Sequence, residues 1–255
     1  KQIPKSSNWF DLILEPDDIG ASEDFGPTSE RDDAFKVGVI TEANPDTALS
    51  RHAAAEALGI NPYQRTLLIN IGSSAIKDLE PIEHLIEQNP DWQVLATKDE
   101  LGRNKDLQRI KVLSGIFPLH PYLNAVDLAV SSVGYNAVHE LVAMGIPTVF
   151  VPAPTTTDDQ YARARAIENR GAGIAVTNGS AADVALQLRE LMNKPERAAS
   201  ITTQCRQIFQ TWTDGASEAT DHILNLEPVA RREYWWQWLG IFIRSWLERN
   251  FGDSL

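Results

Sequence analysis

The chain has 255 residues, of which 43% are hydrophobic and 23% charged, a composition typical of a soluble globular protein. Its formal net charge of −12 argues against nucleic acid as a partner, because contact with a phosphate backbone requires clustered lysine and arginine. The single cysteine, Cys205, excludes an intramolecular disulfide. No Cys/His cluster offers a zinc site, and no signal peptide or membrane-spanning apolar run is present. We therefore expect a cytoplasmic protein, and, because residue 1 is Lys, a fragment of a longer chain.

The first 60 residues predict few regular elements. Residues 1–35 read as a lead-in, with a short strand at Asp11–Leu14 followed by an acidic stretch that contains glycine and proline. Lys36–Ile40 predicts another short strand. Asp46 is a good N-cap for a helix that runs to about residue 58, and Gly59 predicts its end.

From residue 66 onward, short apolar runs alternate with helical segments. The predicted strands are Thr66–Ile71, Gln93–Ala96, Ile110–Leu113, Leu128–Val130, Thr148–Val151 and Gly173–Val176. The predicted helices are centred on Ile82–Ile86 and span Pro121–Val126, Asn136–Met144, Asp158–Asn169 and Ser180–Met192. Because the strands are continuously apolar, they are expected to be parallel and covered by helices on both faces. The predicted fold class is α/β, with a doubly wound parallel sheet.

The last part of the chain is different. Residues 226–255 contain four of the seven tryptophans, all between Arg231 and Phe251. Large apolar side chains recur there on one helical face and polar ones on the opposite face. The pattern predicts a C-terminal amphipathic helix with an aromatic apolar side.

Two turns rich in small residues each lie between a strand and a helix. One is Gly72, Ser73 and Ser74; the other is the segment SSVGYN at 131–136. A helix N-terminus presents free N–H groups and a partial positive charge to an anion, so two such turns at one sheet edge could hold a diphosphate. Simple capping of the following helix is the alternative for either turn alone.

Three further polar residues, Glu140, Asp159 and Gln160, follow the second of these turns. Glu140 lies inside an apolar helix, where it either faces solvent or accepts hydrogen bonds from a vicinal diol such as ribose; taken alone, the pattern favours solvent. Asp159 and Gln160 begin another helix, where they either complement its dipole or hold sugar hydroxyls. His120 and His139 are the nearest candidate bases, but neither has an orienting partner in sequence, and a structural or surface role is expected for both.

The order of these features resembles a known family. The run ALGINPYQRTLLINIGSSA, the strand ending near residues 116–117, and VDLAVSSVGYNAVHELVAMGIPTVFVPAPTTTDDQYARARAIENRGAGIAV resemble the carboxyl-terminal domain of GT-B glycosyltransferases. The likeness covers about 46–192. This segment is similar to the peptidoglycan N-acetylglucosaminyltransferases of lipid II synthesis and to the UDP-glycosyltransferases. Arg163 is a departure, because relatives often carry asparagine there.

The resemblance implies the donor-binding domain of an inverting, metal-independent glycosyltransferase that uses a nucleoside-diphosphate sugar, a UDP-sugar by preference, and no cofactor. The implied contacts are Gly72, Ser73, Ser74, Ser132 and Gly134 for the diphosphate, the backbone of Phe117 for the base, Glu140 for the ribose, and Asp159 and Gln160 for the sugar. The ribose contact now becomes the favoured role of the Glu140 carboxylate.

The resemblance also implies a second, amino-terminal lobe that supplies the acceptor site and the catalytic base. Residues 1–35 are then a linker and remnant of that lobe, 36–225 the Rossmann-like domain, and 226–255 the aromatic helix. The fragment is expected to bind donor without catalysing transfer, and its acceptor is unknown. Helix 231–251 is expected to dock on the missing lobe or to form a homodimer here; peripheral membrane contact and packing on this domain are the alternatives.

Two rival functions remain open at this point. A nucleotide-sugar 2-epimerase shares the fold, but its acidic and arginine-rich site pattern is not evident after Pro152. A degenerate lobe that serves as an interaction module is the non-enzymatic alternative. A measurement of nucleotide-sugar binding separates the interaction module from the glycosyltransferase and the epimerase.

Overall fold

Six parallel strands form the central sheet of the computed structural model, which describes residues 10–23, 34–71, 79–97, 110–113, 115–155 and 158–226. In spatial order they are β5 (Ile110–Val112), β4 (Trp92–Ala96), β3 (Arg65–Asn70), β6 (Leu128–Ser132), β7 (Thr148–Val151) and β8 (Ile174–Ala175). Every neighbouring pair is parallel. The chain builds outward from β3 to one edge, returns to the centre at β6 and builds to the other edge. This order confirms the predicted doubly wound sheet.

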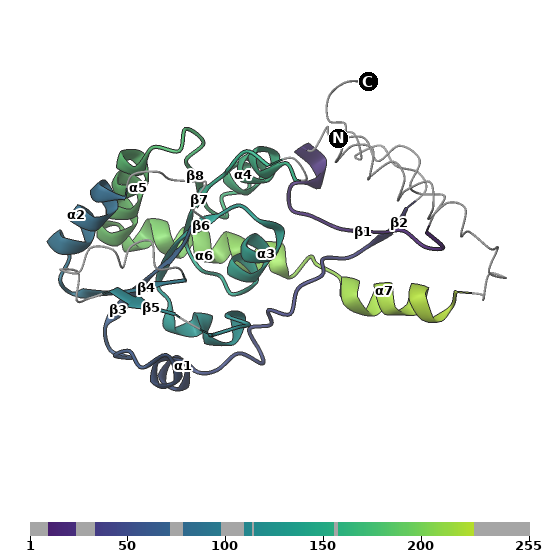
Figure 1. The fold of residues 1–255 in the computed structure, drawn as a ribbon, viewed down its shortest axis with the longest axis horizontal. Coiled ribbons are helices and arrows are strands. Elements are labelled where there is room, and N and C mark those ends of the chain that lie inside the picture. The colour runs from purple at the N-terminus through teal and green to yellow at the C-terminus, as the bar shows by residue number, and fades with distance from the viewer. Residues whose placement is uncertain are drawn as a thin grey trace, which may run out of the picture.

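Helices cover both faces of this sheet. The helices of the described residues are α1 (Arg51–Leu58), α2 (Glu80–Gln88), α3 (Tyr135–Ala143), α4 (Gln160–Asn169), α5 (Ala181–Asn193), α6 (Pro195–Phe209) and α7 (Gly215–Leu224), with short 3-10 helices η2 (Ala21–Glu23) and η3 (His120–Ala125). Of these, η2 packs against α4, and α7 lies away from the six-stranded sheet (Figure 1). Figure 1 shows α2 and α5 on one side of the strands and α3 and α4 on the other. Consecutive residues of the central strands, such as Leu67 and Leu68, are therefore both fully buried.

Several helices begin or end at the capping residues that the sequence predicts. Gly59 and Gly145 adopt left-handed backbone with φ of 60° and 68° just after α1 and α3. The Ser180 side chain accepts a hydrogen bond from the N–H of Asp183 and caps α5. Local sequence signals thus set these helix ends.

The predicted start of α1 is wrong. The helix begins at Arg51, and its N-cap is Ser50, whose side chain accepts from the N–H of Ala53. Asp46 instead lies in a turn organised by Asn44, whose side-chain oxygen accepts from the N–H of Asp46 at 2.9 Å. Asn44 therefore diverts the chain before a helix can start.

Smaller corrections apply elsewhere in the chain. Helix α4 begins at Gln160 rather than Asp158, and the segment predicted as a helix over 121–126 is the 3-10 helix η3. The strand expected at 11–14 is displaced to β1 (Leu14–Pro16). Helices α6 and α7 were not predicted as separate elements, and they follow the last predicted helix.

A second, two-stranded sheet stands apart from the first. Strands β1 and β2 (Phe35–Val37) pair in parallel, with Leu14 opposite Phe35. The start of α7 crosses the end of β2 in backbone contact: the side chain of Glu218 accepts from the N–H of Gly38 at 2.8 Å, and a Cβ placed on Gly215 would lie 1.9 Å from the carbonyl oxygen of Gly38. The described part of the predicted lead-in is therefore fastened to the end of the domain.

Two predicted segments fall outside the described residues. They are the acidic stretch at 24–33 and the amphipathic helix at 231–251. Among the helices that are described, none combines the length and the apolar character needed to cross a bilayer.

Candidate functional site

A pocket of about 540 Å³ opens at the carboxyl edge of the sheet, beside the point between β3 and β6 where the strand order reverses. Open α/β sheets bind ligands at this position. Its walls come from the ends of β3 and β4, from the first turns of α3, from the segment that follows β2 and from the loop before η3. The lining residues are Ile40, Thr41, Glu42, Asn70, Thr97, Leu113, Ile116, Phe117, Pro118, Leu119, Asn136, Ala137 and Glu140.

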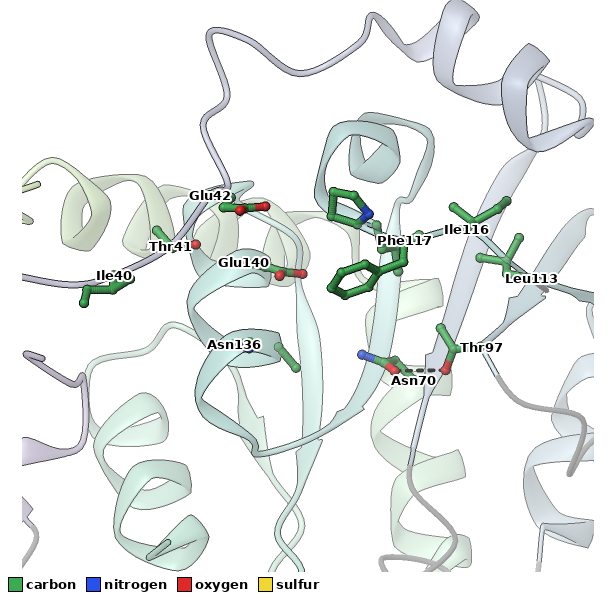
Figure 2. A pocket seen from close by; sticks show the side chains of 13 residues that line it. Ile40, Thr41, Glu42, Asn70, Thr97, Leu113, Ile116, Phe117, Asn136 and Glu140 are labelled. Atoms are coloured by element: carbon green, nitrogen blue, oxygen red, sulfur yellow. Dashed lines mark hydrogen bonds between the residues drawn. The ribbon is translucent and has the colours of Figure 1, made fainter. Parts of the chain in front are cut away.

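Two carboxylates lie on one side of the pocket. Figure 2 shows Glu140, on α3, beneath Glu42, which belongs to the segment after β2. Partial burial raises the pKa of Glu140, and the charge of Glu42 raises it further. A pair of carboxylates offers only hydrogen-bond acceptors, so this side suits a ligand that carries hydroxyl groups.

A carboxamide lies across the pocket from these carboxylates. The hydroxyl of Thr97 donates to the side-chain oxygen of Asn70 at 2.9 Å, so the oxygen is already engaged. Figure 2 shows the amide nitrogen of Asn70 directed away from Thr97 and toward Asn136. This side of the pocket therefore presents hydrogen-bond donors.

The N-terminus of α3 adjoins the pocket. Gly134 is its N-cap residue, and no side chain caps the helix. A Cβ on Gly134 would have no neighbouring atom within 4 Å, so the space before the helix is open. The first N–H groups of α3 are thus left for an anion. Ser132, the last residue of β6, lies at the same turn and is partly exposed.

The remaining wall is apolar. Phe117 is 94% exposed although it lines the pocket, and Leu113 and Ile116 lie beside it. A large aromatic side chain left open to solvent at the mouth of a pocket is available for stacking against a flat ligand.

Asp159 and Gln160 do not line this pocket. One carboxylate oxygen of Asp159 accepts from the N–H of Ala162 at 2.9 Å and caps α4, and the side-chain oxygen of Gln160 accepts from the N–H of Ala153 at 3.0 Å. Asp159 thus has a structural role at the start of α4, and Gln160 joins α4 to the segment after β7. Contact of either residue with a donor sugar stays a prediction. Gly72, Ser73 and Ser74 lie outside the described residues.

Neither candidate histidine lines the pocket. His139 is fully buried, and its Nδ1 donates to the carbonyl of Tyr135 at 2.7 Å. The Nδ1 atom of His120 is buried without a hydrogen-bond partner among the described residues. No group of three or more His, Cys, Asp or Glu side chains in the described part of the chain is arranged to hold a metal ion.

Sequence reasoning did not single out Glu42, Asn70 or Thr97. Two of them carry a readable signal, because Asn70 is a polar residue that ends the apolar strand β3 and Thr97 is one that follows the apolar strand β4. In a parallel sheet, such residues gather at the carboxyl edge.

Comparison with known proteins identifies the family of this chain. The pattern of the Glycosyltransferase family 28 C-terminal domain matches residues 77–215. The UDP-N-acetylglucosamine--N-acetylmuramyl-(pentapeptide) pyrophosphoryl-undecaprenol N-acetylglucosamine transferase of Listeria monocytogenes is 26% identical over 207 residues, which are 74% of this chain and 56% of that enzyme. The enzyme of the same name from Streptomyces coelicolor is 30% identical over 146 residues, 52% of this chain and 39% of that enzyme. The chain thus spans about half the length of the curated relatives it matches.

Solved structures share the fold at low sequence identity. Anabaena Alr3699/HepE, in complex with UDP and glucose, has a TM-score of 0.60 at 14% identity and covers 87% of this chain and 65% of that one. The glycosyltransferase SnogD from Streptomyces nogalater has a TM-score of 0.58 at 15% identity, with 85% and 56% covered. The fold is that of a Rossmann-like GT-B lobe, and the chain belongs to the glycosyltransferase family 28 C-terminal domain family.

Proposed function

We propose that this domain binds the nucleoside-diphosphate sugar donor of a glycosyltransferase, with the nucleotide in the pocket beside β3 and β6. The observation that carries the proposal is the polarity of the pocket. Acceptors gather at Glu42 and Glu140, whereas donors gather at Asn70 and at the N-terminus of α3. A nucleotide has the complementary polarity, with a diol at its ribose and acceptor oxygens at its phosphates.

The groups of a nucleotide can be assigned to these walls. The ribose hydroxyls donate to Glu140, and the base lies at Phe117 beside the apolar wall. The diphosphate meets the turn at Ser132 and Gly134 and the N–H groups of α3. This anion site needs no cluster of basic residues, which fits a chain whose net charge is −12.

Names of related proteins narrow the donor. The Listeria relative is named for UDP-N-acetylglucosamine, and Anabaena Alr3699/HepE was solved with UDP and glucose. Spinosyn rhamnosyltransferase SpnG, which has a TM-score of 0.56 at 15% identity, was solved with thymidine diphosphate. These names support a pyrimidine nucleotide, and we favour a UDP-sugar whose sugar reaches Asp159 and Gln160.

The chemistry proposed is inverting transfer without a metal. A base deprotonates an acceptor hydroxyl, the oxygen attacks the anomeric carbon, and the bond from that carbon to the diphosphate breaks. Oriented N–H groups at α3 stabilise the charge that develops on the leaving diphosphate. The base and the acceptor site are expected on an amino-terminal lobe, so residues 1–255 alone bind donor and do not transfer it.

Calorimetry with UDP, TDP and UDP-N-acetylglucosamine tests this proposal. We expect the wild type to bind UDP and Glu140→Ala to bind it at least about tenfold more weakly, because hydrogen bonds to a charged group contribute about 1.5–3 kcal/mol. Glu56→Ala, which removes an exposed carboxylate on α1, is the matched control and should bind like the wild type. Equally negligible heat for the wild type and Glu140→Ala would reject the nucleotide site and favour an interaction module.

A further inference from the structure

Arg163 has an environment unlike that of any other lysine or arginine in the described part of the chain. Only 4% of it is exposed, and it is the one buried cationic side chain there. It belongs to α4 and does not line the pocket. A buried guanidinium is costly unless its N–H groups are all engaged, so its partners show what the charge does.

The Arg163 guanidinium joins three separate segments. Its Nε donates to the carboxylate of Asp18, between β1 and η2, at 2.9 Å. Its Nη1 and Nη2 donate to the two oxygens of Asp158, before α4, at 2.8 and 2.7 Å. Its Nη1 also donates to the carbonyl oxygen of Val133 at 2.7 Å. Val133 lies between Ser132 and Gly134, so the guanidinium holds the turn that precedes α3.

The pairing of Arg163 with Asp18 also affects the ionisation of the Asp18 carboxyl group. Burial would raise the pKa of Asp18, yet the hydrogen bonds and charge of Arg163 hold that pKa below its ordinary value. The Asp18 segment also lies directly against α4, since a Cβ on Gly20 would be 2.8 Å from the Cα of Arg163. The backbones of the two segments are therefore in close contact.

The same turn is fastened from its other end by Tyr135. The Tyr135 hydroxyl donates to the carbonyl of Asp17 at 2.9 Å and accepts from the N–H of Ile40 at 3.1 Å. Ile40 begins the segment that brings Glu42 into the pocket. Contacts from Arg163 and Tyr135 therefore fix the residues on both sides of Gly134.

We propose that Arg163 is a positioning residue of the donor site. Through the carbonyl of Val133 it sets the orientation in which the Ser132–Gly134 turn and the N–H groups of α3 meet a diphosphate. It also makes that orientation depend on Asp18, in the segment that enters the domain. This inference rests on the proposed function, and it adds a residue that touches neither nucleotide nor sugar.

The inference makes a prediction that a general stabilising role does not. Arg163 contacts none of the residues assigned to base and ribose, such as Phe117 and Glu140. Loss of the guanidinium should therefore weaken binding of the diphosphate and leave binding of the nucleoside unchanged. A purely structural ion pair would change both affinities by one factor, or neither.

The test is the ratio of the uridine and UDP dissociation constants, with uridine titrated by NMR and UDP by calorimetry. In Arg163→Met we expect the ratio to fall at least about tenfold, the size of one charge-assisted hydrogen bond, with uridine affinity unchanged. Arg163→Lys keeps a charge between Asp18 and Asp158 without the planar fork and should show a smaller fall. Arg165→Gln removes an exposed arginine of the same helix that pairs with Glu23 at 3.9 Å, and should match the wild type.

The outcomes separate this inference from the proposed function. A wild type that binds UDP, with an Arg163→Met ratio equal to its own, would overturn the positioning role alone. A wild type that binds no UDP would overturn both. If Arg163→Met does not fold, Asp158→Asn takes its place, because it weakens one ion pair of Arg163 and leaves the guanidinium paired with Asp18. A ratio of dissociation constants equal to that of the wild type in both Asp158→Asn and Arg163→Lys would also overturn the positioning role.

Discussion

Nε2 of His139 accepts a hydrogen bond from the backbone N–H of Ile19 at 3.3 Å, and so joins α3 to a segment 120 residues earlier. Nδ1 of the same ring donates to the carbonyl of Tyr135. The ring must therefore be neutral, with its hydrogen on Nδ1, because a protonated Nε2 could no longer accept. The side chains of Tyr135 and Trp212 pack against it.

The first prediction concerns acid stability. Burial lowers the pKa of His139 below its ordinary 6.5, although Asp18 and Asp17 act in the opposite direction and Arg163 adds to the lowering. With the folded pKa below the unfolded one, the stabilising contribution is complete above pH 6.5 and is lost as pH falls toward the folded value. In urea unfolding from about pH 8 to about pH 5, we expect the wild type to lose more stability than His139→Gln. His52→Gln, at an exposed site, should follow the wild type, and a common slope for all three would contradict the prediction.

The second prediction concerns the pH dependence of donor binding. The pKa of Glu140 is raised by burial and by Glu42, so its carboxylate becomes protonated at a higher pH than an ordinary glutamate. We expect UDP affinity to fall as pH is lowered through that raised pKa, since a protonated carboxyl group loses acceptor capacity. Glu42→Gln should move the midpoint of the fall to lower pH. Calorimetry across a pH series measures this, and an identical midpoint in both proteins would count against it.

The third prediction concerns the effect of Glu140 on the free energy of unfolding. A folded pKa above the unfolded one means that ionised Glu140 destabilises the fold, fully above the folded pKa and not at all below the unfolded one. Glu140→Gln should therefore increase the free energy of unfolding at neutral pH, with the gain disappearing below the ordinary value of 4.5. Denaturation with urea at both pH values checks it; a gain that is independent of pH would assign the effect to packing.

The fourth prediction concerns the single thiol. Cys205 is fully buried, its Sγ donates to the carbonyl of Ala172 at 3.2 Å, and burial raises its pKa to about 12. We expect no reaction with a thiol-specific reagent in the folded protein and full reaction after denaturation, because the thiolate is the reactive form. Rapid labelling under native conditions would show that α6 opens locally.

The fifth prediction concerns the crossing of β2 and α7. Gly215→Ala would place a methyl group 1.9 Å from the carbonyl oxygen of Gly38, so the two segments must separate. We expect a loss of about 1–3 kcal/mol in the free energy of unfolding, the usual cost of overpacking. Gly134→Ala, which meets no atom within 4 Å, is the control for folding and should stay near the wild type.

Much of the sheet could be predicted because its information is local. The fully buried strand residues form continuous apolar runs, and Gly145 and Ser180 mark helix ends through backbone geometry and capping. The start of α1 was missed because Asn44, Asp46 and Ser50 are all acceptable caps in sequence, and only the turn at Asn44 decides among them.

The candidate site was less predictable because its partners are distant in sequence. Glu140 could be recognised by type and place, but nothing near it in sequence shows that Glu42 shares its pocket. Arg163 stood out in the sequence only as a departure from the family pattern, and its role depends on Asp18, which lies 145 residues earlier.

The bond between Gly38 and Glu218 spans 180 residues and has a consequence for biosynthesis. A ribosome releases β2 long before it releases α7. During that interval the nascent chain has the β1–β2 edge without the helix that later covers its end, and exposed parallel edges can pair with neighbouring chains. The hydrogen bond from Gly38 to Glu218 can form only after α7, the last described helix, has been synthesised.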